Sequence, residues 1–175
     1  PGAPPRLSVG NLILEIHTAE GQPALRVRRI DHPRRLRDPG LRYFPPAPHW
    51  VIHARWQPLS VPQQARIDMV GGRSETVSLT HQAVFDHDGQ RVTLLPTHWK
   101  AGAPMFVIRD LTAGGETYPA ARFLIGEDVT DDSITLDFNK AHTPPCGFTE
   151  FAVCPLPPRE NVLPFRIEAG ELRPD

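Results

Sequence analysis

Long apolar runs are missing from this 175-residue chain, and several common classes of protein are excluded by that lack. Nowhere do eighteen apolar residues follow one another, so no transmembrane helix is predicted. No charged segment followed by an apolar stretch opens the chain, so no secretory signal peptide is predicted. A cytoplasmic location is therefore expected, although a chain that begins at Pro1 through processing or truncation leaves secretion open.

An excess of one charge is also missing. The formal net charge is −1 and the isoelectric point is near 6.8, which gives no general attraction to polyanions. The basic run RVRRIDHPRRLR holds six arginines between Arg26 and Arg37, but few aromatic residues lie among them. We interpret this run as a solvated face and predict neither a nucleic-acid partner nor a membrane partner.

Cysteine is scarce as well, because the chain has only two, and a disulfide scaffold is therefore excluded. Catalytic and cofactor signatures are missing too. The sequence has no GxSxG, HExxH or phosphate-binding loop, and no dinucleotide fingerprint. We therefore predict no cofactor, and whether the protein is an enzyme stays open.

The chain is rich in proline and in segments where apolar and polar residues alternate as they do in a β-strand. In HWVIHARWQ, residues 50, 52, 54 and 56 are apolar while His53 and Arg55 lie out of phase, so Trp50 and Trp56 are predicted to face the core. Twenty-one prolines exceed twice the average usage of about 5%. No ten-residue stretch reads as an amphipathic helix. Strands are predicted near residues 11–17, 24–30, 50–57, 64–70, 75–85, 90–95, 104–109, 120–126, 133–138 and 162–168.

About ten short strands without crossover helices predict an all-β fold. We expect a single antiparallel meander, either closed as a barrel, possibly a split barrel, or folded as a two-sheet sandwich. We predict one domain over 1–175, with an ordered connection at 31–49 and a long, ordered, proline-rich loop at 139–161 before the last strand. Prolines make that loop rigid, and long ordered loops are usually functional.

Three segments of this chain resemble a family without a known activity. They are GLRYFPPAP, FVIRDLTAGGETYPAARFL and ITLDFNKAHTPPCGFTEFAVCPLPPRENVLPFRIEAGE. Over residues 24–172 the chain resembles the bacterial and archaeal domain-of-unknown-function family sixteen eighty-four. The resemblance implies which residues the members share, but it implies no reaction, because no activity is known for the family. Typical members read AYNPxC, where this chain has His142 and Thr143 in place of tyrosine and asparagine.

The proline-rich loop holds His142, Cys146 and Cys154. A structural zinc site needs four ligands, so His98 or His81 would have to supply the fourth. Buried thiols without metal are the favoured interpretation, and a disulfide is the remaining alternative. A further hypothesis makes His142 the base of a nucleophilic Cys146.

Polar residues on two predicted strands form a second candidate site. Asp137 and Asn139 alternate with the apolar residues 134, 136 and 138, so they lie on the opposite face of their strand. Arg122 leaves the apolar phase of its strand in the same way. Its guanidinium group suits an anionic ligand, or a structural ion pair with Asp137 or Glu116.

A small-molecule site at one end of a barrel is therefore the leading hypothesis, with an anionic ligand as one option. Candidate ligand-binding residues are Tyr118, Arg122, Asn139, His142, Cys146 and Asn161. If the site is catalytic, Asp137 or Glu160 is the candidate general base of a cofactor-independent hydrolase or isomerase. The first alternative is a noncatalytic binding or assembly module whose polar residues are structural. A flavin-binding split barrel is a weaker alternative, because only analogy of fold supports it.

Overall fold

The computed structural model describes residues 5–19, 22–35 and 40–174. They form two compact units, Pro1–Pro39 and Gly40–Asp175, where the sequence predicted one domain. The all-β class is confirmed, and no described helix is long and apolar enough to span a membrane. The strands are β1 (Arg6–Val9), β2 (Leu12–Ala19), β3 (Gln22–Arg29), β4 (Val51–Asp68), β5 (Ser74–His87), β6 (Gln90–Leu94), β7 (His98–Lys100), β8 (Ala103–Ile108), β9 (Arg122–Glu127) and β10 (Ser133–Asp137).

The first unit is a three-stranded antiparallel sheet in the order β1-β2-β3. Leu14 lies opposite both Leu7 and Val27, so apolar side chains share one face of this sheet. On the other face Glu15 accepts hydrogen bonds from the guanidinium groups of three arginines, Arg6, Arg26 and Arg28, at 2.7–2.9 Å. The hydrogen bonds from Arg28 and Arg6 lower the pKa of Glu15 to about 2.

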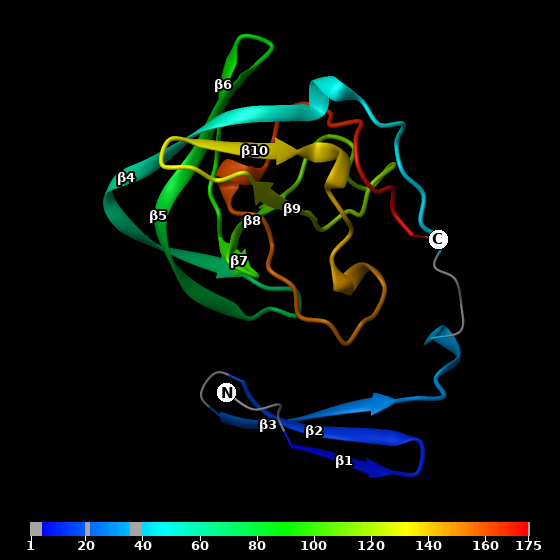
Figure 1. The fold of residues 1–175 in the computed structure, drawn as a ribbon. Coiled ribbons are helices and arrows are strands. Elements are labelled where there is room, and N and C mark those ends of the chain that lie inside the picture. Colours follow the sequence, from blue (N-terminus) through cyan, green and yellow to red (C-terminus); the bar gives the residue numbers. More distant parts are fainter. Residues whose placement is uncertain (1–4, 20–21, 36–39, 175) are drawn as a thin grey trace. The chain divides into compact units, whose positions relative to one another are not determined.

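The second unit is built on a seven-stranded antiparallel sheet in the order β6-β5-β4-β10-β9-β8-β7 (Figure 1). Sequence neighbours pair as in a meander, and β10 returns to pair with β4. The two end strands, β6 and β7, are consecutive in the chain but do not pair within the described residues. The sheet is therefore open, and the closed barrel among our predictions is not formed.

Strand β4 is one long strand where two were predicted, at 50–57 and 64–70. Its pairing with β5 shifts register between Pro58 and Gln63. Pro58 and Pro62 cannot donate to a ladder, which explains why the regular pairing stops there and resumes at Gln63. Both β4 and β5 curve strongly around the unit in Figure 1.

The main core lies on the concave side of this sheet. Trp50, Ala54 and Trp56 are 6%, 2% and 4% exposed, while His53 and Arg55 are exposed, which confirms the predicted register of β4. Other members of this core come from five more strands, from the turn after β10 and from the C-terminal segment, among them Phe85, Leu94, Phe106, Leu124, Leu136, Phe138, Ile167 and Ala169.

The predicted last strand at 162–168 is wrong. This segment is extended but joins its neighbour only by isolated bonds, such as those from Leu163 N to Arg109 O (2.7 Å) and from Leu111 N to Phe165 O (3.1 Å). Pro164 lies in its middle and has no N–H to donate, so a regular ladder cannot form there.

The proline-rich loop at 139–161 contains or adjoins short 3-10 turns at Phe138–Lys140, Pro145–Gly147 and Arg159–Asn161. It covers the outer face of β8 and β9 and forms a second, smaller core there. This core includes Met105, Val107, Ala121, Phe123 and Cys154, with Val70, Ile125, Cys146 and Ala152 packed against it. Strand β8 is therefore covered on both faces, which explains its uninterrupted apolar run.

The predicted connection at 31–49 is only partly described, because residues 36–39 lie outside the described residues. Its last part joins the C-terminal segment through the backbone. Phe44 N donates to Gly170 O at 2.9 Å, and Leu172 N donates to Arg42 O at 2.8 Å. Leu41 and Tyr43, in the same part of the connection, are 46% and 54% exposed.

Candidate functional site

Arg122 is the most deeply buried charged side chain among the predicted site residues. It begins β9 and is 1% exposed, and its Nη2 atom lies 2.6 Å from Oδ2 of Asp110. The same nitrogen donates to Ile167 O at 3.1 Å, and Nη1 donates to Ala169 O. The predicted partner, Asp137 or Glu116, is therefore wrong: the carboxylate belongs to Asp110.

Asp110 in turn fixes the turn that joins β8 to β9. Its Oδ1 accepts from the backbone N and the hydroxyl of Thr112 at 2.8 and 2.7 Å, and from Ile167 N at 3.2 Å. The Thr112 hydroxyl also lies 2.9 Å from that of Thr117. These groups are buried and satisfy one another, so the Arg122–Asp110 pair ties strand, turn and C-terminal segment together.

Gly170 allows the C-terminal segment to approach this pair. Its φ is +79°, and a Cβ at this position would lie 2.5 Å from Ala141 O and 2.7 Å from Phe138 O. Only glycine fits there. The close approach places the carbonyl groups of Ile167 and Ala169 within reach of Arg122.

Asp137 and Asn139 form a corner at the start of β4 instead of a site with Arg122. The Asn139 side chain accepts from Ala47 N at 2.9 Å and donates to Ala47 O and to Asp137 Oδ1, each at 3.0 Å. Lys140 Nζ lies 3.4 Å from the other oxygen of Asp137. The amide of Asn139 therefore supplies the hydrogen-bond acceptor for Ala47 N, while Ala47 O also accepts from Trp50 N.

Asn161 makes a similar tie and is fully buried. Its Oδ1 accepts from Leu95 N at 2.8 Å, and its Nδ2 donates to the carbonyl groups of Leu95 and Val107, each at 2.9 Å. The side chain thus joins the end of β6 to β8. Its donors and its acceptor are all hydrogen-bonded to backbone groups.

The remaining predicted residues lie in the smaller core or beside it. The Tyr118 hydroxyl donates to Cys146 O at 3.0 Å, and burial raises the pKa of Tyr118 to about 12. His142 is half-buried, and its ring meets Phe123 edge-on at 6.0 Å. Cys146 N donates to Cys154 Sγ at 3.4 Å, and both cysteines are free thiols. Cys154 is buried as predicted, whereas Cys146 is half-buried.

The proposed fourth zinc ligands lie in other surroundings. His98 Nε2 is 2.5 Å from a carboxylate oxygen of Glu75, and His81 stacks on Trp56 at 4.9 Å between ring centroids. In the described part of the chain, no three residues among His, Cys, Asp and Glu are grouped as metal ligands would be.

We expect Cys154 to react only slowly with iodoacetamide in the native protein. Burial raises the pKa of its thiol to about 11, and the reactive species is the thiolate. The rate should therefore rise as the pH approaches 11, and Cys146 should be modified first at pH 8. Mass spectrometry of digested protein after timed labelling measures both rates. Equal labelling of Cys154 in native and urea-unfolded protein would contradict its burial.

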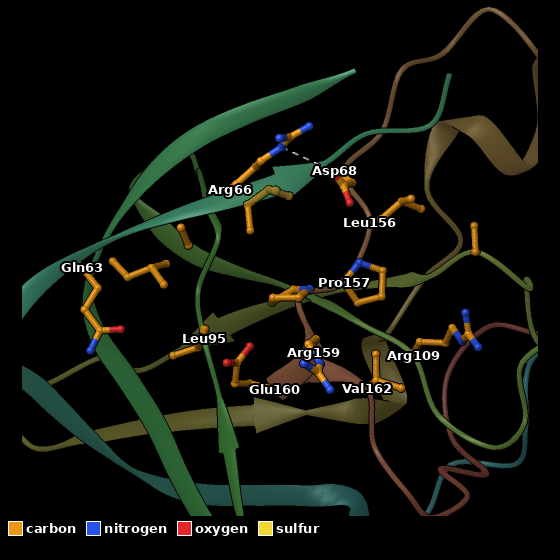
Figure 2. A pocket seen from close by; sticks show the side chains of 15 residues that line it. Gln63, Arg66, Asp68, Leu95, Arg109, Leu156, Pro157, Arg159, Glu160 and Val162 are labelled. Atoms are coloured by element: carbon orange, nitrogen blue, oxygen red, sulfur yellow. Dashed lines mark ion pairs between the residues drawn. The ribbon is translucent and has the colours of Figure 1, made fainter. Parts of the chain in front are cut away.

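A cleft lies between the second half of β4 and the end of the proline-rich loop, at residues 156–162 (Figure 2). Its volume is about 500 Å³. It is lined by Gln63, Ala65, Arg66, Ile67, Asp68, Leu79, Leu95, Arg109, Ala120, Leu156, Pro157, Pro158, Arg159, Glu160 and Val162. Of the predicted site residues, only Glu160 belongs to it.

Three arginines give this cleft its charge. Arg66 lies 3.7 Å from Asp68, an exposed pair. Within the described ranges, no carboxylate lies at ion-pair distance from Arg109 or Arg159, and both side chains are exposed. Arg109 follows β8 and points away from the core that its neighbours Ile108 and Asp110 enter. Two guanidinium groups are thus available to an anion.

Sequence reasoning missed these arginines. Arg159 directly precedes the candidate residues Glu160 and Asn161, and Arg109 directly precedes Asp110. A signal was present for Arg109, because it is the only charged residue in the run APMFVIR. No local pattern indicates that β4 lies beside residues 156–162.

Fold and cleft together define an all-β protein with an open, curved antiparallel sheet and an arginine-lined cleft at its side. The model of a protein family of unknown function, DUF1684, matches residues 39–172, and the chain belongs to this family. The predicted resemblance is thereby confirmed.

The solved structures that are similar to this chain include one that matches over most of both chains. It is the solution NMR structure of an uncharacterized protein of Haloarcula marismortui, with 30% sequence identity and a TM-score of 0.61. The match covers 81% of this chain and 80% of that one. No match was found among curated proteins.

Proposed function

We propose that this protein binds a small anionic molecule, carrying a carboxylate or a phosphate group, in the cleft between β4 and residues 156–162. The observation that carries the proposal is the pair Arg109 and Arg159, two cations that line one cleft and have no carboxylate partner in the described chain. Guanidinium groups bind carboxylate and phosphate through paired hydrogen bonds. A volume of about 500 Å³ lies within the usual range of ligand sites.

The proposed function is binding and not catalysis. Glu160, one of the two predicted general bases, lines the cleft but its side chain is exposed, and Asp68 is 71% exposed. Asp137, the other predicted base, is engaged with Asn139 and Lys140 at the corner before β4. General acid or base catalysis needs a group that is positioned against the reacting atoms. Glu160 is better suited to accept a hydrogen bond from a donor group on the ligand.

We expect glutarate, citrate or inorganic phosphate to raise the melting temperature of the protein in a concentration-dependent way. The Arg159→Gln and Arg109→Gln variants should each weaken binding of the best of these ions about tenfold or more, because each removes a hydrogen bond to a charged group. Isothermal titration calorimetry measures the loss.

The matched control is Arg91→Gln, since Arg91 is an exposed arginine of β6 that does not line the cleft. It changes the net charge equally and should leave the dissociation constant unchanged. Equal weakening in all three variants would mean that only the overall charge matters, which would overturn the proposed site.

A further inference from the structure

Strand β4 presents one unpaired edge to the cleft. At the end of this strand Met69 N donates to Arg73 O at 2.8 Å, so the backbone of Met69 points toward the β5 side. In an antiparallel ladder, the backbone groups of successive residues point to opposite sides of the strand. The groups of Asp68, and by the same alternation those of Arg66 and Gln64, therefore point away from β5.

The first part of that edge is already covered by the proline-rich loop. Val70 N donates to Cys154 O at 2.8 Å, and Leu156 N donates to Asp68 O at 2.7 Å. This short ladder then stops, because Pro157 and Pro158 have no N–H to donate. Beyond it, no backbone hydrogen bond on this side joins Gln64 or Arg66 to another described residue.

The edge, the arginines and the apolar lining lie in one cleft. The cleft is also lined by Leu95, Leu156 and Val162, which are at least partly exposed and offer an apolar surface to side chains. None of the fifteen described residues that line the cleft is aromatic, so a nucleobase or flavin ring would find no stacking surface. An aliphatic ligand with its own hydrogen-bonding groups fits this wall better.

We propose that the ligand is a short extended peptide with a carboxylate, which pairs with β4 at Gln64 and Arg66 and places its carboxylate beside Arg109 and Arg159. This inference rests on the proposed function and names the class of ligand. Strand addition supplies affinity through main-chain hydrogen bonds, and here it would extend the ladder that Pro157 ends. A peptide of two or three residues suits the size of the cleft.

The test is a calorimetric titration of the full chain with acetyl-Ala-Leu-Glu, with glutarate, and with two forms of the peptide methylated at the nitrogen of Ala or of Leu. The peptide should bind at least tenfold more tightly than glutarate. In an added strand only alternate N–H groups face the partner, so one methylated form should lose about tenfold in affinity and the other less.

Two protein variants test the free edge itself. Arg66→Ala removes the side chain and keeps the backbone N–H, whereas Arg66→Pro also removes the N–H on the side away from β5, where proline is tolerated. Peptide binding should fall about tenfold more in Arg66→Pro than in Arg66→Ala, with glutarate binding equal in both. Thermal melting checks that both variants are folded.

The outcomes separate the two proposals. If glutarate binds as tightly as the peptide and neither methyl group weakens binding, the peptide inference is overturned while anion binding stands. If neither glutarate nor the peptide binds, both proposals are wrong. Should Arg66→Pro fail to fold, the methylated peptides still decide the role of the edge.

Discussion

Replacing Arg122 by methionine is expected to lower the free energy of unfolding by about 3–5 kcal/mol. The substitution leaves Asp110 buried without its cation, and it removes the donors to Ile167 O and Ala169 O. Removing one partner of a buried ion pair lowers the stability by more than the intact pair contributes, because the remaining charge stays buried without a counterion. Urea unfolding followed by tryptophan fluorescence measures the change.

Three further variants test whether the loss of stability comes from breaking the buried Arg122–Asp110 pair. Arg166→Met removes an exposed arginine that pairs with Glu116 and Glu168, and it should cost less than about 1 kcal/mol. Arg122→Met combined with Asp110→Leu should cost less than the sum of the single changes. Arg122→Lys keeps the charge and provides a folded intermediate if the methionine variant does not fold. An Arg122→Met variant as stable as the parent would contradict the structural role.

Replacing Trp56 by alanine is expected to destabilise the protein by about 3–5 kcal/mol, while Arg55→Ala should be nearly neutral. Trp56 is 4% exposed, stacks on His81 and meets Phe106 edge-on at 6.3 Å. Arg55 is exposed, and its only ion pair in the described chain, with Asp86, spans 4.0 Å at the surface. Urea unfolding measures both effects, and equal losses would overturn the register of β4.

Residues that follow strict alternation could be predicted from the sequence. The predictions for the buried face of β4 and for the apolar residues of β10 were correct, because each strand has one face against the core. Strand β8 gave no such signal, since the main core covers one of its faces and the proline-rich loop the other. What the proline-rich loop covers could not be predicted, because its own sequence carries no sign of its partner strands.

The partner of Arg122 and the cleft depend on long-range geometry. Arg122 was correctly singled out as a charge in an apolar strand, yet Asp110 stands in a turn and gives no periodic signal. The cleft forms because β4 continues past Pro58 and Pro62 and then pairs with residues 154–156. Neither event follows from local propensity, so the arginines of the cleft could not be grouped from sequence.

We propose that ligands bind in the cleft, while the Arg122–Asp110 pair and the corner at Asp137 hold the fold together. The most direct test is a two-dimensional amide NMR titration of the labelled chain with acetyl-Ala-Leu-Glu. We predict that the largest shifts lie at residues 64–68 and 159–162 and at Arg109. Shifts gathered instead at Tyr118, Asp137, His142 and Cys146 would contradict binding in the cleft.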